Sequence, residues 1–278
     1  MLTVTTLASG SSGNAALVSC GGTHILLDAG ISARRITTGL KELGVNPELL
    51  TAIFITHEHQ DHIAGLQVLT KKLRVPIVST NPTCAELARK APNTLDLLRS
   101  QEAGTGLQVG RLWVESFSTP HDAADSVGYA ISGDSGRLVL CTDLGYATPE
   151  VKAAAADCDL ILCEANHDVR WVQDGPYPYY LKERILGDHG HLSNEAGADL
   201  AIHAVEHGAR TVILGHLSSE NNTPAHAYEV VSRRMREAGI DPETDIHLSV
   251  APRKELGRTV RLERGSEPVF TERSAAIC

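Results

Sequence analysis

The chain has 278 residues, of which 42% are hydrophobic and 21% charged, and its formal net charge is −9 at pH 7. This composition is typical of a soluble globular protein and excludes a membrane span, which needs roughly 18 uninterrupted apolar residues. The acidic balance argues against nucleic-acid binding through bulk charge, and six cysteines without a C-x-x-C pair argue against a disulfide or zinc-finger framework.

Short strands and amphipathic helices are mixed along the chain. Alternation and β-branching predict strands at residues 3–8, 15–19, 24–28, 51–56, 112–117, 127–132, 137–142, 160–164 and 211–214. Helical periodicity predicts helices at residues 33–43, 63–72, 82–91, 149–156, 194–207 and 224–238. Strand runs interleaved with helices, without strict βαβ alternation, predict an α/β protein built as an αββα sandwich of two mixed sheets flanked by helices.

The chain shows no linker rich in Pro, Gly or Ser that would divide it. We therefore expect one domain over residues 1–265, followed by a tail over residues 266–278 that lacks periodicity and is loosely ordered. The first residues read as a strand rather than as a secretory signal, so we expect a cytoplasmic protein.

The first two predicted strands are joined by Ser9-Gly10-Ser11-Ser12-Gly13-Asn14. Gly and Ser are typical of a tight turn. A more specific, functional interpretation is a phosphate contact through Ser11, Ser12 or Asn14, although the segment lacks the Lys and the following helix of a P-loop. Both interpretations stay open.

Four potential metal ligands, His57, His59, Asp61 and His62, follow the apolar strand at residues 51–56. A sharp strand-to-helix turn lets the first two face one metal ion and the last two face a second. Helix capping would explain Asp61 alone, so the segment indicates a metal site.

Three further candidate ligands, His121, Asp143 and His216, each follow a predicted strand. Ligands at the ends of several strands converge on one edge of the sheets. Imidazoles and carboxylates suit Zn²⁺, Mn²⁺ or Fe²⁺, and a bridging carboxylate holds two cations close enough to share a water molecule. We therefore expect a hydrolase with two divalent metal ions and a bridging hydroxide as the nucleophile.

The order H-x-H-x-D-H, then His, Asp and His, resembles the metallo-β-lactamase superfamily over residues 1 to about 250. The resemblance implies one metal ion at His57, His59 and His121, a second at Asp61, His62 and His216, and Asp143 between them. It also implies that Asp28 organises the histidine loop through hydrogen bonds. Asp61 is in addition a candidate catalytic residue.

Within the superfamily, the chain is similar to the small single-domain nucleases of the YycJ (WalJ) type. The strings that carry this likeness are Ser9–Asn14, Thr56-His57-Glu58-His59, Pro120-His121-Asp122-Ala123, Cys163-Glu164-Ala165-Asn166-His167-Asp168, Gly190-His191-Leu192-Ser193-Asn194 and Gly215-His216-Leu217-Ser218. The likeness implies a manganese-activated phosphodiesterase that degrades DNA from the 5′ end, with a role in DNA repair. We expect single-stranded or end-containing DNA as its partner, RNA as a further substrate, and no membrane.

The alkoxide leaving group of such a reaction needs a proton. His191 is the candidate donor and Glu164 the candidate orienting carboxylate, because the segment after Gly190 resembles the histidine motif of tRNA 3′-processing enzymes of the same superfamily. His189 is a rival, and a plain turn and helix cap is the alternative. The candidate substrate-binding residues of these strings are Asn166, His167, Ser193 and Asn194.

Residues 171–180 hold four aromatic side chains beside Arg170 and Lys182, and their Gly and Pro residues predict a loop. This loop either packs over the sheet edge or offers a surface on which unpaired bases stack. The arginines of the last predicted helix are either solvated or in contact with phosphate. They are Arg233, Arg234 and Arg236.

Two other functions compete with a nuclease. A thioesterase of the glyoxalase II type shares the histidine loop, and a non-catalytic regulatory protein could retain the metals without turnover. The sequence predicts no oligomeric state.

Overall fold

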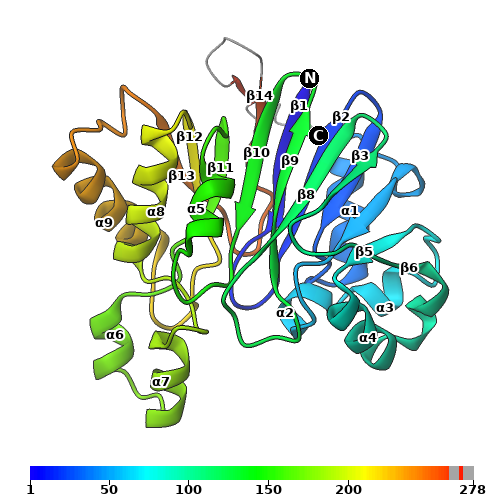
Figure 1. The fold of residues 1–278 in the computed structure, drawn as a ribbon, viewed down its shortest axis with the longest axis horizontal. Helices are drawn as coiled ribbons and strands as arrows, with labels where there is room; N and C mark the ends of the chain where they lie inside the picture. Colours follow the sequence, from blue (N-terminus) through cyan, green and yellow to red (C-terminus); the bar gives the residue numbers. More distant parts are fainter. Residues whose placement is uncertain (263–268, 272–278) are drawn as a thin grey trace, which may run out of the picture.

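The computed structural model describes residues 1–262 and 269–271. Two β-sheets lie face to face, and helices cover their outer faces (Figure 1). The first sheet has the strand order β15-β14-β1-β2-β3-β4-β5-β6 and the second has the order β13-β12-β11-β10-β9-β8-β7. The predicted αββα sandwich is confirmed.

Both sheets mix parallel and antiparallel strands. The first sheet contains β1 (Leu2–Ala8), β2 (Ala15–Cys20), β3 (Thr23–Leu27), β4 (Ala52–Phe54), β5 (Ile77–Ser79), β6 (Leu98–Ser100), β14 (Thr259–Leu262) and β15 (Val269–Thr271). The second contains β7 (Gly106–Val109), β8 (Leu112–Ser118), β9 (Val127–Gly133), β10 (Gly136–Cys141), β11 (Leu160–Glu164), β12 (Thr211–Gly215) and β13 (His247–Val250).

The described residues form nine α-helices. They are α1 (Ala33–Glu42), α2 (Gln60–Ile63), α3 (Leu66–Leu69), α4 (Asn81–Lys90), α5 (Pro149–Ala155), α6 (Val169–Asp174), α7 (Tyr179–Leu186), α8 (Asn194–Glu206) and α9 (Pro224–Glu237), with 3₁₀ turns at Pro47–Leu49 and Pro92–Leu97. Buried side chains of α1, α3 and α4 pack against the first sheet, and those of α5, α8 and α9 pack against the second. No helix among the described residues is both long and apolar enough to span a bilayer.

A third apolar cluster lies between the two sheets and contains residues of both, such as Val18 and Ile25 of the first and Ile131 and Leu160 of the second. Phe54 and Tyr129 meet there edge to face, with ring centroids 5.4 Å apart. Because the sheets share this core, we infer one domain.

The nine predicted strands are present within two residues of their predicted bounds, and five of the six predicted helices within one residue. The helix predicted at residues 63–72 is wrong in its extent, because it is split into α2 and α3. The Gly65 N–H bonds to the Ala29 carbonyl, and a Cβ at Gly65 would lie 2.1 Å from the Ile31 carbonyl oxygen. This close contact with the preceding loop breaks the helix.

Two irregular regions also differ from expectation. The loop predicted at residues 171–180 contains the end of α6 and the start of α7, separated by a short Gly-Pro segment. Within the predicted tail, Val269–Thr271 pairs with β14 as β15, a strand too short to produce a periodic signal. The rest of that tail lies outside the described residues.

Candidate metal centre

Strand direction explains why distant residues meet at one edge. β3 and β4 are parallel, as are β10, β11 and β12. β8 runs in the direction of β10, because both are antiparallel to β9. The side chains at or just after the ends of these strands are Asp28, His57, His121, Asp143, Glu164 and His216, and their contacts place them at a single edge.

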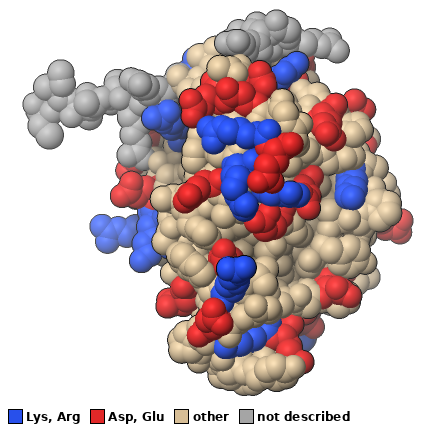
Figure 2. Space-filling view, turned by 90° about the vertical axis from the view of Figure 1, so that its left-hand side faces the viewer, with Lys and Arg blue, Asp and Glu red and all other residues tan. Residues whose placement is uncertain are grey.

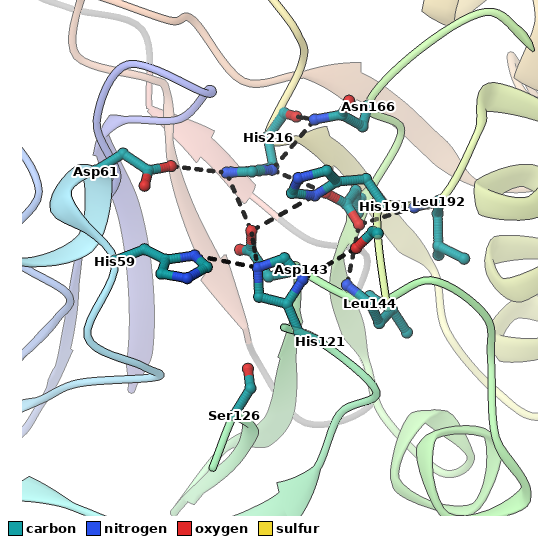
Figure 3. Close-up of polar contacts among 12 residues, drawn as sticks. His59, Asp61, His121, Ser126, Asp143, Leu144, Asn166, His191, Leu192 and His216 are labelled. Carbon is teal, nitrogen blue, oxygen red and sulfur yellow. Dashed lines mark hydrogen bonds and ion pairs between the residues drawn. The ribbon is translucent and has the colours of Figure 1, made fainter. Parts of the chain in front are cut away.

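The structure brings all seven predicted ligands together. His57, His59 and His121 form one group whose ligand atoms lie within 4.8 Å of one another, and Asp61, His62 and His216 form a second. Asp143 lies between the two groups, with Oδ1 3.8 Å from His121 Nε2 of the first group and 3.4 Å from His216 Nε2 of the second. Figure 3 shows Asp143 in the middle of the cluster, with His59 and Asp61 on one side and His191 on the other.

Four imidazoles share one orientation, with Nδ1 bonded to the protein and Nε2 facing the centre. The His121 Nδ1 donates to the Gly190 carbonyl at 3.0 Å, and the His57 Nδ1 lies 3.0 Å from the Thr56 hydroxyl. His62 donates through Nδ1 to Asp28 and His216 to Glu164, both at 2.8 Å. These bonds orient the Nε2 lone pairs as metal ligands.

Asp28 has the organising position that the resemblance implies. It is buried, and its carboxylate accepts hydrogen bonds from the Thr56 N–H at 2.9 Å, from the Thr56 hydroxyl at 3.1 Å and from His62. Thr56, which was not among the predicted site residues, therefore connects the carboxylate to the histidine loop. Its position immediately before His57 was the only available signal.

Glu164 holds two imidazoles, not only the predicted one. Its Oε1 accepts from His191 Nδ1 at 2.9 Å and from His216 Nδ1 at 2.8 Å. Its Oε2 accepts from the backbone N–H groups of Leu192 at 3.0 Å and Leu144 at 3.3 Å. This fully buried carboxylate thus joins a candidate metal ligand to the candidate proton donor.

Three residues at this edge adopt the left-handed backbone conformation although they are not glycine. Asp28 has φ of 58°, Asp143 of 63° and His216 of 54°. Such conformations cost of order 1–3 kcal/mol and cluster at functional sites. Here they turn the chain sharply at strand ends and point each side chain at the cluster.

Two buried atoms without hydrogen-bond partners among the described residues indicate a metal centre, independently of any likeness to other proteins. The His57 Nε2 and the Asp143 Oδ2 are buried and make no hydrogen bond within the described part of the chain. Native proteins rarely leave such atoms without a partner, and a bound cation would satisfy both. Imidazole nitrogens and carboxylate oxygens are suitable donors for divalent metals.

The two ligand groups differ in their affinity for protons. Burial and the neighbouring imidazoles lower the pKa of His57 well below its ordinary value, and burial also lowers the pKa of His121. Burial opposes protonation of His62 and His216, but Asp143 and the other carboxylates prevail, so the pKa of His62 lies well above its ordinary value and that of His216 rises to about 10. The second group therefore holds protons that a metal ion must displace.

His191, and not its rival His189, is beside this cluster. Its Nδ1 is bonded to Glu164 and lies 3.6 Å from the Asp143 Oδ1. Burial opposes protonation, but the Glu164 carboxylate raises the pKa of His191 above its ordinary value. His189 is exposed.

The predicted substrate-binding residues fall into two classes. Ser11 and Ser12 are exposed on the loop between β1 and β2, and Ser193 is partly exposed as the N-cap of α8. Three asparagines of the predicted set are buried, and their side-chain amides form hydrogen bonds with the loops of the centre. Asn14 contacts His62, Asn166 donates to the His216 carbonyl, and Asn194 pairs with Asn222.

His167, the remaining predicted substrate-binding residue, is also buried, and burial lowers its pKa to about 4. Its ring lines a cavity of about 400 Å³ together with Ser193, Arg170 and His226. A neutral imidazole in this cavity can contact a ligand through its free ring nitrogen.

The arginines of α9 are engaged in ion pairs, and Figure 2 shows basic and acidic side chains interleaved on this face. Arg233 pairs with Glu195 at 2.7 Å, Arg236 with Glu243 at 3.1 Å, and Arg234 with Asp199. This arrangement favours a solvated surface over a phosphate site.

The comparisons with known proteins agree with this geometry. Residues 23–217 match the family model described as Beta-lactamase superfamily domain. The chain is 37% identical over 245 residues to the exodeoxyribonuclease WalJ of Streptococcus pneumoniae, covering 87% of this chain and 91% of the relative. It is 34% identical over 236 residues to the exodeoxyribonuclease YycJ of Bacillus anthracis, covering 84% and 89%. The zinc-bound PqqB of Methylobacterium extorquens shares the fold, with a TM-score of 0.69 at 18% identity over 94% of this chain and 100% of that one.

Proposed function

The chain belongs to the β-lactamase superfamily, and from this premise we propose that it is a metal-dependent exodeoxyribonuclease. One observation carries the proposal: a histidine outside the ligand set, His191, lies against the metal centre and is held there by Glu164. Cleavage of a phosphodiester leaves a poor alkoxide leaving group, which needs such a donor. The identity to named exodeoxyribonucleases over most of their length supports the same substrate class.

The ligand assignment follows the two groups of side chains. We assign one divalent cation to His57, His59 and His121 and the other to Asp61, His62 and His216, with Asp143 in reach of both. Two cations bound there would supply the nucleophile by acidifying water and would offset the charge of the phosphate. Asp61 is the most exposed side chain of the second group, with 24% of its surface accessible, so it faces the substrate.

His191 would act on the leaving group. Because its Nδ1 is bonded to the Glu164 carboxylate, Nε2 is the ring atom that can deliver a proton to the departing sugar oxygen. Glu164 acts as a positioning residue that fixes the ring and its tautomer. We further propose cleavage from the 5′ end with Mn²⁺ as the activating ion, while the cytoplasmic location and the role in DNA repair stay predictions.

The test is a substrate panel with purified protein and Mn²⁺. We expect release of nucleotides from 5′-labelled DNA and slow cleavage of a generic phosphodiester, both abolished by His57→Ala. RNA and S-lactoylglutathione complete the panel. Consumption of the thioester alone would support the thioesterase alternative, and no turnover of any substrate by a metal-loaded protein would support the regulatory one.

A further inference from the structure

Exposed aromatic side chains are concentrated in the segments that follow β10 and β11. The whole chain contains only three Phe, two Trp and six Tyr. Within the described residues, the exposed ones are Trp113, Tyr146, Trp171, Tyr179 and Tyr180. All of these except Trp113 lie on α6, on α7 or in the loop after β10. Large exposed aromatics that the core does not need indicate a binding surface.

The helices α6 and α7 are joined to the metal edge and project away from both sheets (Figure 1). Arg184 of α7 forms an ion pair with Asp122, whose Oδ1 lies 3.5 Å from His121 Nε2. The His191 N–H donates to the Ile185 carbonyl at the end of α7. A strand of substrate that leaves the metal centre on this side therefore meets the two helices.

Trp171 is held rigidly although it is exposed. Its indole stacks on the His226 imidazole, with ring centroids 4.8 Å apart and planes inclined by 10°. His226 is fixed in turn by a 2.8 Å bond from Nε2 to Asp168, and the same carboxylate caps α6 by accepting the Trp171 N–H. One indole face is covered by the imidazole, and 41% of the residue is accessible to solvent.

Cationic and polar groups accompany this stack. Arg170 is exposed and makes no ion pair with the described residues. It lines the cavity of about 400 Å³ that also contains Ser193, two residues beyond His191. An aromatic face beside an unpaired arginine is the combination that binds bases and phosphates of single-stranded nucleic acid.

We propose that Trp171, supported by His226 and Asp168, is a stacking platform for an unpaired nucleobase of single-stranded DNA. This inference rests on the proposed function, which it deepens by naming the form of the substrate. Bases inside a duplex already stack on one another and cannot lie on the indole, so the platform selects single strands or frayed ends.

Binding tests the platform without relying on cleavage. In a Trp113→Phe background, Trp171 is the only tryptophan, and its fluorescence should be quenched by a phosphorothioate oligothymidylate but not by an oligomer of the same length made of abasic units. Anisotropy of the labelled oligothymidylate should show about ten-fold weaker binding for Trp171→Ala, a loss within the range of one stacked base. Trp171→Phe should restore most of the affinity.

The chain supplies a matched control. Trp113 is as exposed as Trp171, with 41% of its surface accessible, but it lies near the start of β8, at the opposite end of that strand from His121. Trp113→Ala should bind like the wild type, and both alanine variants should cleave a small phosphodiester at the wild-type rate. The platform would be overturned if abasic and base-containing oligomers bound equally well, or if Trp171→Ala bound the oligothymidylate as tightly as the wild type. It would also be overturned if Trp171→Ala lost as much activity on the small diester as it lost in affinity for the oligomer. Absence of DNA cleavage by the wild type would overturn the nuclease proposal instead.

Discussion

Replacing Glu164 by glutamine would test whether one carboxylate holds both a metal ligand and the proton donor. Its Oε1 receives two imidazole N–H groups and its Oε2 receives two backbone N–H groups. A glutamine of the same shape has one oxygen that accepts and one amide nitrogen that only donates. Whichever way the side chain turns, that nitrogen faces two donors.

The magnitude follows from these bonds. Each hydrogen bond to a charged group contributes about 1.5–3 kcal/mol, so loss of two corresponds to at least about 3 kcal/mol, or roughly a 150-fold effect. If the amide faces the imidazoles, His191 and His216 must accept at Nδ1, which moves their protons to Nε2. We therefore expect kcat to fall roughly 100-fold or more, and metal affinity to fall about 10- to 100-fold.

The assay measures kcat on a 5′-labelled single strand at saturating Mn²⁺, with metal affinity determined separately by titration. Glu102→Gln, an exposed glutamate between β6 and β7, is the control and should match the wild type. A Glu164→Gln enzyme that cleaves within two-fold of the wild-type rate at saturating metal would refute the reasoning.

Three further predictions concern the proton donor, the pH and the backbone. His191→Ala should lower kcat by about 10²–10⁴-fold with unchanged metal content by elemental analysis, whereas lost metal would make His191 a ligand. Because the pKa values of His62 and His216 are raised in the metal-free protein, the imidazoles keep their protons until pH exceeds those values, and metal must displace them. Calorimetry in buffers of different ionisation enthalpy should therefore show that metal binding releases protons. The metal affinity of the group formed by Asp61, His62 and His216 should fall about ten-fold per pH unit for each released proton as pH decreases. A metal affinity that does not change with pH would contradict this prediction. Gly30→Ala should destabilise the protein by about 2–3 kcal/mol and weaken metal binding, because the new Cβ would lie 1.6 Å from the Asp61 carbonyl oxygen. Gly39→Ala is the control, because its Cβ would meet only flexible leucine side chains at 3.2 Å, and it should change neither stability nor metal affinity. Denaturation measures the stability of both variants, and titration measures their metal affinity.

The cluster of candidate ligands could be predicted from sequence because these residue types are unusual at the positions they occupy. Histidines and aspartates at the ends of apolar strands have no role in a core, so His57, Asp143 and His216 were recognisable without coordinates. Strand ends also locate the edge where these side chains converge. The fold followed from the same alternation of strands and helices.

The partners of the ligands were harder to predict, because hydrogen bonds between distant segments have no local pattern. Nothing in the sequence tells that Glu164 bonds His216 as well as His191, or that the Ser9 hydroxyl accepts the His216 N–H at 2.9 Å. For the same reason the sequence does not show that the Asn166 and Asn194 side chains are buried, and their role in substrate binding stays a prediction. Strands of three residues such as β5 and β6 are too short to show alternation.

The left-handed conformations of Asp28, Asp143 and His216 have a consequence for directed evolution. Glycine occupies such backbone angles without strain, and asparagine does so more readily than histidine. A library screened only for heat resistance should therefore enrich these smaller or neutral residues at the three positions, where they relieve the chain. The surviving clones would be robust, well-folded and inert, which makes selection for turnover at every round indispensable.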